Sequence, residues 1–94
     1  MNDAVAVHLR ITGRVQGVGY RFWTVEQATA RNLAGWVRNR RDGSVEALIA
    51  GPPATVRAMV EACRQGPMGA RVTDIQEAQT EPPAEPGFRQ LPTA

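Results

Sequence analysis

The spacing of the hydrophobic residues changes along this chain, and the change limits the folds that the chain can adopt. Over residues 5–11, valine, leucine and isoleucine alternate with other residues, which is the period of a half-buried strand. From residue 20 to about residue 32, the apolar residues recur at the spacing of a helix with one buried face. Along the whole sequence, the two periods predict strands at 5–11, 36–40, 45–49 and 71–79, and helices at 20–32 and between Pro53 and Gly66.

Each predicted helix has a single apolar face. The first face comprises Phe22, Val25, Thr29 and Leu33, and the second comprises Val56, Met59, Val60 and Cys63. Asp42-Gly43 predicts a hairpin turn between two strands, because both turn positions tolerate positive φ. The order β-α-β-β-α-β predicts a ferredoxin-like α+β fold, an antiparallel sheet of four to five strands with both helices on one face. Many functions share this fold, so it identifies none of them.

The last third of the sequence is less regular. Val72 and Ile75 fall on opposite faces of a regular strand, so we expect a β-bulge between them. We predict one domain over residues 1–94, with a core at about 5–79. Residues 80–94 are expected to form a proline-rich linker and a short edge strand from Phe88 to Leu91.

Composition excludes several classes of protein. The single cysteine, Cys63, allows no internal disulfide and no thiolate metal site, and it is expected to be a buried apolar residue. The single histidine, His8, is expected to be a solvent-facing strand residue. No window is apolar enough to span a membrane, and the first residues do not resemble a secretory signal, so we expect a cytoplasmic protein.

A glycine-rich loop, Gly13 to Gly19, joins the first strand to the first helix, and Arg21 follows it. Such a loop can turn successive N–H groups toward an anion, and a guanidinium beside it can hold two phosphate oxygens. The nucleotide-triphosphate loop requires a lysine, which this chain lacks, and the dinucleotide motif requires a glycine where Phe22 stands. The spacing alone fits a tight connection as well as a phosphate site.

Two segments resemble one known family. GRVQGVGYR, ending at Arg21, is similar to the acylphosphatase signature, and GWVRNRRDGSVE, beginning at Gly35, is similar to that family's second conserved block. Gly66-Pro67 and the following Ala70-Arg71-Val72 are also typical of the family, so the resemblance extends from about Val7 to Gln76. The tail departs from it, because Pro92 follows the segment where members have a final strand.

The resemblance implies a hydrolase that cleaves the carboxyl–phosphate bond of acyl phosphates to a carboxylate and inorganic phosphate. The phosphoryl group is then expected to contact Val15, Gln16, Gly17, Val18, Gly19, Tyr20 and Arg21, with Arg21 holding it and Asn39 orienting the attacking water. No metal or other cofactor is implied, and we expect a monomer with no nucleic-acid or membrane partner. Arg38, Arg40 and Arg41 are expected to be solvated charges that raise the local anion concentration.

Three alternatives remain beside this interpretation. Asn39, just before Asp42-Gly43, fits a turn-forming role as well. Ferredoxin-like sheets can bind RNA through exposed aromatic residues, but here only Trp36 and Phe88 are available on strands. Acylphosphatase-like domains also occur as nonenzymatic parts of larger maturation proteins, but the presence of both Arg21 and Asn39 favours the enzyme.

Overall fold

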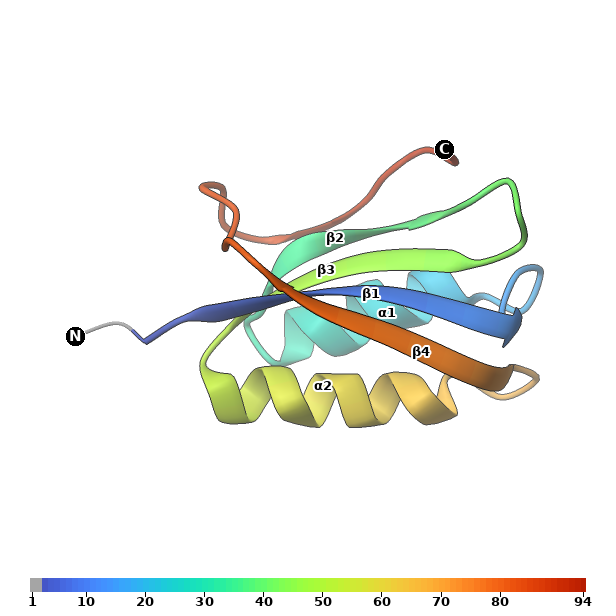
Figure 1. Ribbon diagram of the computed structural model, residues 1–94, viewed down its shortest axis with the longest axis horizontal. Coiled ribbons are helices and arrows are strands. Elements are labelled where there is room, and N and C mark those ends of the chain that lie inside the picture. Colours follow the sequence, from blue (N-terminus) through green and yellow to red (C-terminus); the bar gives the residue numbers. More distant parts are fainter. Residues whose placement is uncertain (1–2) are drawn as a thin grey trace.

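The strands and helices follow the order that the hydrophobic spacing predicts. The structure is a computed structural model, and it describes residues 3–94 (Figure 1). The elements are β1 (Val5–Arg14), α1 (Tyr20–Ala30), β2 (Ala34–Asn39), β3 (Val45–Gly51), α2 (Pro53–Gln65), β4 (Arg71–Thr80) and β5 (Phe88–Gln90). Both helices cover the same face of the sheet (Figure 1), so the predicted ferredoxin-like α+β fold is confirmed.

The five strands form one sheet in the order β4-β1-β3-β2-β5. The pairs β1–β3, β1–β4 and β2–β3 are antiparallel, as predicted. The pair β2–β5 is parallel, with Gly35 opposite Phe88 and Val37 opposite Gln90. The sheet is therefore mixed rather than wholly antiparallel, because residues 81–87 carry the chain from the end of β4 to the far edge of the sheet before β5 begins.

A register shift in the β1–β4 pair confirms the predicted bulge. Thr12 pairs with Asp74 and Gly13 pairs with Val72, which leaves Thr73 unpaired between them. The extra residue brings Val72 and Ile75 to the same apolar side, where Ile75 is buried and Val72 packs against the core.

The two helices differ in how well their buried faces are predicted. In α2 the buried residues are Val56, Met59, Val60 and Cys63, as expected. In α1 the buried residues are Tyr20, Thr24 and Ala28, whereas Phe22 is 66% exposed. The predicted face of α1 is therefore wrong at Phe22 and Thr29, which are exposed, whereas Val25 packs against the core and Leu33, just beyond the helix, is buried. The hydroxyl of Thr24 donates to the carbonyl oxygen of Tyr20 at 2.8 Å, so this polar side chain lies in the core without an unmet hydrogen bond.

Tyr20 joins the two helices from inside the core. Its hydroxyl donates to the carbonyl oxygen of Cys63 at 2.5 Å, and its ring lies against Trp23, with 5.4 Å between the ring centroids. Burial raises the pKa of Tyr20 well above its ordinary value and raises the pKa of the Cys63 thiol to about 11. Cys63 is thus an inert core residue, as the sequence predicts. Within residues 3–94, neither helix has the length and apolar character that crossing a membrane requires.

Gly35 leaves no room for a side chain between β2 and β3. Its φ is 138°, and a Cβ at this position would overlap the carbonyl oxygen of Leu48 on β3. At Gly43 in the hairpin turn, φ is 95° but a Cβ would meet no atom within 4 Å. The two positions therefore separate the cost of the dihedral angle from the cost of a steric overlap.

We expect Gly35→Ala to lower the free energy of unfolding by about 3 kcal/mol or more, because strain at positive φ and a backbone shift add together. Gly43→Ala should cost only about 1 kcal/mol, from the dihedral angle alone. Urea unfolding of both variants measures the difference. Equal losses would show that β2 and β3 can separate at Gly35 without penalty.

Candidate functional site

The predicted site residues come together around a small pocket beside the start of α1. The pocket has a volume of about 170 Å³. It is lined by Val15, Gln16, Gly17, Gly19, Tyr20, Arg21, Phe22, Asn39 and Gln90. Every residue that the sequence analysis placed at the site lines this pocket except Val18, which packs against the hydrophobic core. The pocket thus combines the β1–α1 loop with the last residues of β2 and β5.

The loop has the geometry of an anion-binding turn. Gly17 and Gly19 both have φ of 77°, and Gly19 is the last residue before α1. The first N–H groups of a helix have no intrahelical acceptor, and at the start of α1 no side chain caps them. These N–H groups, with the positive end of the helix dipole, favour a phosphate group at this end of the pocket.

Gln16 fixes the loop against the β2–β3 hairpin. Its side-chain Nε2 donates to the carbonyl oxygens of Arg40 at 2.7 Å and Ser44 at 2.8 Å. These two oxygens belong to the turn that begins directly after Asn39. Gln16 therefore holds the loop in a fixed position relative to Asn39, and its side-chain N–H groups are already engaged.

The guanidinium of Arg21 has no acidic partner among residues 3–94, unlike those of Arg10, Arg38 and Arg40. Arg38 and Arg40 both donate to Glu46 Oε1, at 2.7 and 3.3 Å, and Arg10 is paired with Asp42. Contrary to expectation, Arg38 and Arg40 are thus ion-paired rather than free. Within the described chain, Arg21 is the cation that lines the pocket.

Glu46 is the shared partner of several side chains on the open face of the sheet, the face that the helices do not cover. Burial opposes ionisation of Glu46, but the hydrogen bonds from Arg38 and His8 outweigh it and hold the pKa of this carboxyl below its ordinary value. His8 Nε2 lies 2.6 Å from Glu46 Oε2, so the histidine is a partner of this carboxylate and does not line the pocket.

Asn39 carries a buried acceptor with no partner. It is the last residue of β2, and its Oδ1 makes no hydrogen bond within residues 3–94. The hairpin turn is closed by other groups: Asp42 Oδ1 accepts from the N–H and the hydroxyl of Ser44, at 2.9 and 2.6 Å. The side chain of Asn39 therefore does not form the turn. A buried carbonyl oxygen without a hydrogen-bond partner is costly, and Asn39 lines the pocket, so this side chain is a candidate for a role beyond structure.

Two residues of the pocket were not predicted from the sequence. The sequence predicts Phe22 on the buried face of α1, and it predicts Gln90 in a short edge strand with no role at the site. The spacing of Tyr20, Thr24 and Ala28 is the signal that could have turned Phe22 outward, because residue 22 then lies on the opposite side of the helix. No comparable signal marks Gln90.

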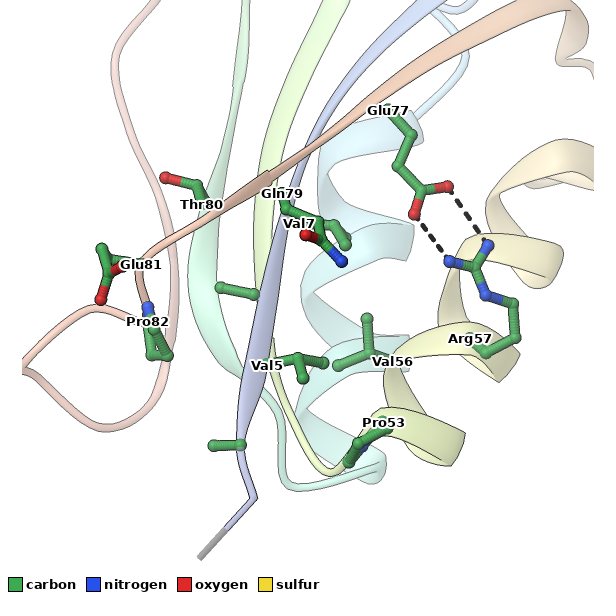
Figure 2. A pocket seen from close by; sticks show the side chains of 12 residues that line it. Val5, Val7, Pro53, Val56, Arg57, Glu77, Gln79, Thr80, Glu81 and Pro82 are labelled. Carbon is green, nitrogen blue, oxygen red and sulfur yellow. Dashed lines mark hydrogen bonds and ion pairs between the residues drawn. The ribbon is translucent and has the colours of Figure 1, made fainter.

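A larger cavity lies elsewhere, between the start of α2 and the strands β1 and β4 (Figure 2). It has a volume of about 470 Å³. Its cation, Arg57, makes two hydrogen bonds to the Glu77 carboxylate, at 3.2 and 2.6 Å, which Figure 2 shows as dashed lines. These bonds hold the pKa of Glu77 below its ordinary value. Since the charge of Arg57 is matched by Glu77, this cavity lacks the free cation that the smaller pocket has.

Comparison with known proteins adds an independent finding. A family model described as "Acylphosphatase" matches residues 7–90. An acylphosphatase of Acidiphilium cryptum is 58% identical over 84 residues, covering 89% of this chain and 92% of the relative. An acylphosphatase of Azorhizobium caulinodans is 60% identical, covering 88% and 90%. The crystal structure of acylphosphatase from Bacillus subtilis superposes with a TM-score of 0.87 at 38% identity, covering 93% of this chain and 98% of that one.

Proposed function

The chain belongs to the acylphosphatase family, and from that premise we propose how its pocket performs the reaction. The protein is an acylphosphatase, a hydrolase that converts an acyl phosphate and water to a carboxylate and inorganic phosphate. One observation carries the proposed mechanism. Within the described residues, Arg21 has a guanidinium without an acidic partner and Asn39 has a buried Oδ1 without a hydrogen-bond partner. Both residues line the same pocket, beside N–H groups that favour an anion.

The phosphoryl group of the substrate binds at the β1–α1 loop. The N–H groups of the loop and of the first turn of α1 donate to its oxygens, with Gly17 and Gly19 supplying the backbone curvature. Arg21 donates two parallel hydrogen bonds to the same group, and no carboxylate competes for its guanidinium within residues 3–94. Since phosphoryl transfer has a loose transition state, this positioning and charge stabilisation supply most of the catalysis.

The attacking water is oriented by Asn39. Its side-chain amide hydrogen-bonds to the water and directs a lone pair of the water oxygen at phosphorus. The new P–O bond forms as the bond between phosphorus and the bridging oxygen breaks, and the carboxylate leaves with the electron pair. A phosphate oxygen accepts the proton of the water, so no protein base is needed. A neutral amide suits this position because a carboxylate would repel the phosphoryl group.

The alternative functions receive less support. The curated relatives named above are covered over almost their full length by this chain, which favours the enzyme over an accessory domain. Trp36 faces away from the helices, but the Arg38 guanidinium stacks on its ring at 4.9 Å and His8 contacts its edge. It is therefore not free to stack on an RNA base.

We further propose that the enzyme acts as a cytoplasmic monomer on a small-molecule substrate, without a nucleic-acid or membrane partner. The site needs no residue from a second copy, because loop, Arg21 and Asn39 come from one chain. Light scattering coupled to size-exclusion chromatography tests the monomer, and a mass twice that of the chain would contradict it.

Our first prediction for the reaction concerns metal ions and substrate class. The residues that line the pocket include no histidine, cysteine or carboxylate, and no group of three such residues in the described chain could hold a metal ion. Hydrolysis of benzoyl phosphate should therefore continue after exhaustive treatment with EDTA. A phosphomonoester should be cleaved very slowly, because its alkoxide leaving group needs an acid that this pocket lacks. Loss of activity with EDTA, or efficient monoester cleavage, would contradict the mechanism.

For Asn39, we expect Asn39→Ala to lower kcat by roughly 10²–10³ with little change in KM, because it orients water and not substrate. Asn39→Asp keeps the shape and the acceptor but adds a charge, and it should be similarly impaired at neutral pH. Steady-state kinetics with benzoyl phosphate measure both variants, and thermal melts check folding. Near-normal turnover in Asn39→Ala would assign Asn39 a purely structural role.

For Arg21, substitution by lysine separates charge from geometry. Lysine keeps the charge but offers a point donor in place of a planar fork. We expect Arg21→Lys and Arg21→Ala each to lose on the order of 10³-fold in kcat/KM and to bind inorganic phosphate more weakly. Arg71→Lys, at an exposed arginine on β4 outside the pocket, is the matched control and should retain full activity. A folded and fully active Arg21→Lys would mean that the loop N–H groups hold the phosphate alone.

A further inference from the structure

Phe22 occupies an unusual place for a large apolar side chain. It is 66% exposed although it lies in the first turn of α1, directly after Arg21. In residues 3–94, the only other large apolar residue with high exposure is Met68, at 99%, in the turn between α2 and β4. Phe22 lines the candidate pocket, whereas Met68 does not.

The size of the pocket determines which part of the substrate reaches Phe22. Pockets that enclose a whole small molecule usually have volumes of about 300–1,000 Å³, and this pocket has about 170 Å³. It therefore accommodates the phosphoryl group and the water, while the acyl group of the substrate extends beyond it. The polar lining formed by the loop, Arg21 and Asn39 surrounds the phosphoryl end, so the acyl group meets the residues at the rim.

Two lining residues outside the loop, Phe22 and Gln90, present an apolar and a polar side chain. Phe22 comes from α1, and Gln90 comes from the end of β5, a strand that packs beside α1. An exposed phenyl ring offers an apolar surface on which another ring or an alkyl chain can pack, with a preference for offset or edge-to-face arrangements. All acyl phosphates share the same phosphoryl end, so selection among them depends on contacts of this kind.

We infer that Phe22 is a specificity-determining residue whose ring binds the acyl group, and that the enzyme favours acyl phosphates with an aromatic or bulky apolar acyl group. This inference rests on the proposed phosphoryl site, because it requires the substrate to enter with its phosphoryl end first. Phe22 contributes binding of the acyl group, whereas Arg21 and Asn39 act on the reacting atoms.

The test compares benzoyl phosphate with acetyl phosphate in the variants Phe22→Ala, Phe22→Leu and Met68→Ala. In Phe22→Ala, the KM for benzoyl phosphate should rise about 3- to 10-fold, from loss of a ring contact. The rise for acetyl phosphate should be smaller, because a methyl group covers little of the ring. The inhibition constant of inorganic phosphate should not change. Phe22→Leu should recover part of the loss, and Met68→Ala should behave as the wild type.

The outcomes distinguish failure of the acyl subsite at Phe22 from failure of the proposed phosphoryl site. If Phe22→Ala raises both KM values equally, or neither, while Arg21→Ala abolishes both activities, the acyl subsite is refuted and the phosphoryl site stands. An increase in the inhibition constant of phosphate in Phe22→Ala would assign the residue to the phosphoryl site and would also refute the subsite. If the wild type hydrolyses neither substrate, the proposed function and the subsite are both refuted. Because Phe22 is mostly exposed, its variants should fold, which thermal melts verify.

Discussion

The burial of Tyr20 determines which residues of α1 face the pocket. Its hydroxyl is bonded to the backbone of α2 at Cys63, and its carbonyl oxygen receives the hydroxyl of Thr24 one turn later. These contacts fix the rotation of α1 about its own axis. With residue 20 facing the core, residues 21 and 22 must turn away from it, since successive residues on a helix differ by about 100°. Because Tyr20 is buried, the next two residues, Arg21 and Phe22, both face the pocket.

A second constraint fixes the distance between the two proposed catalytic side chains. Arg21 belongs to α1 and Asn39 belongs to β2, and the sheet alone would leave the loop between β1 and α1 free to move relative to β2. Gln16 removes this freedom with two hydrogen bonds to the turn after Asn39. Gln16 therefore connects the β1–α1 loop to the turn after Asn39, because its side-chain N–H groups donate to backbone oxygens of that turn.

Much of the fold was predictable because the signals were local. The strands, the hairpin at Asp42-Gly43 and the bulge near Thr73 follow from period and parity, which depend only on neighbouring residues. The predicted α1 face misplaces Phe22 and Thr29, because apolar spacing alone does not show that Thr24 is buried with its hydroxyl bonded to the preceding turn. The parallel pairing of β5 was missed because three residues carry no period, and their partner strand is distant in sequence. The pocket residues came from the family resemblance, but Phe22 and Gln90 required the assembled structure.

The distribution of ion pairs explains how a chain of modest charge can have a specific anion site. All eleven basic residues are arginines, and the net charge is +2. On the open face of the sheet, two carboxylates offset the charge of three of them: Glu46 pairs with Arg38 and Arg40, and Asp42 pairs with Arg10. An anion that approaches this side of the molecule meets paired charges, whose attraction is weakened at short range. At the loop, by contrast, Arg21 has no such partner within the described residues and stands beside backbone N–H groups that also favour negative charge. The selectivity of the site therefore arises from Arg21 and the adjacent N–H groups together, while the ion pairs of Arg10, Arg38 and Arg40 weaken their competition for the same anion.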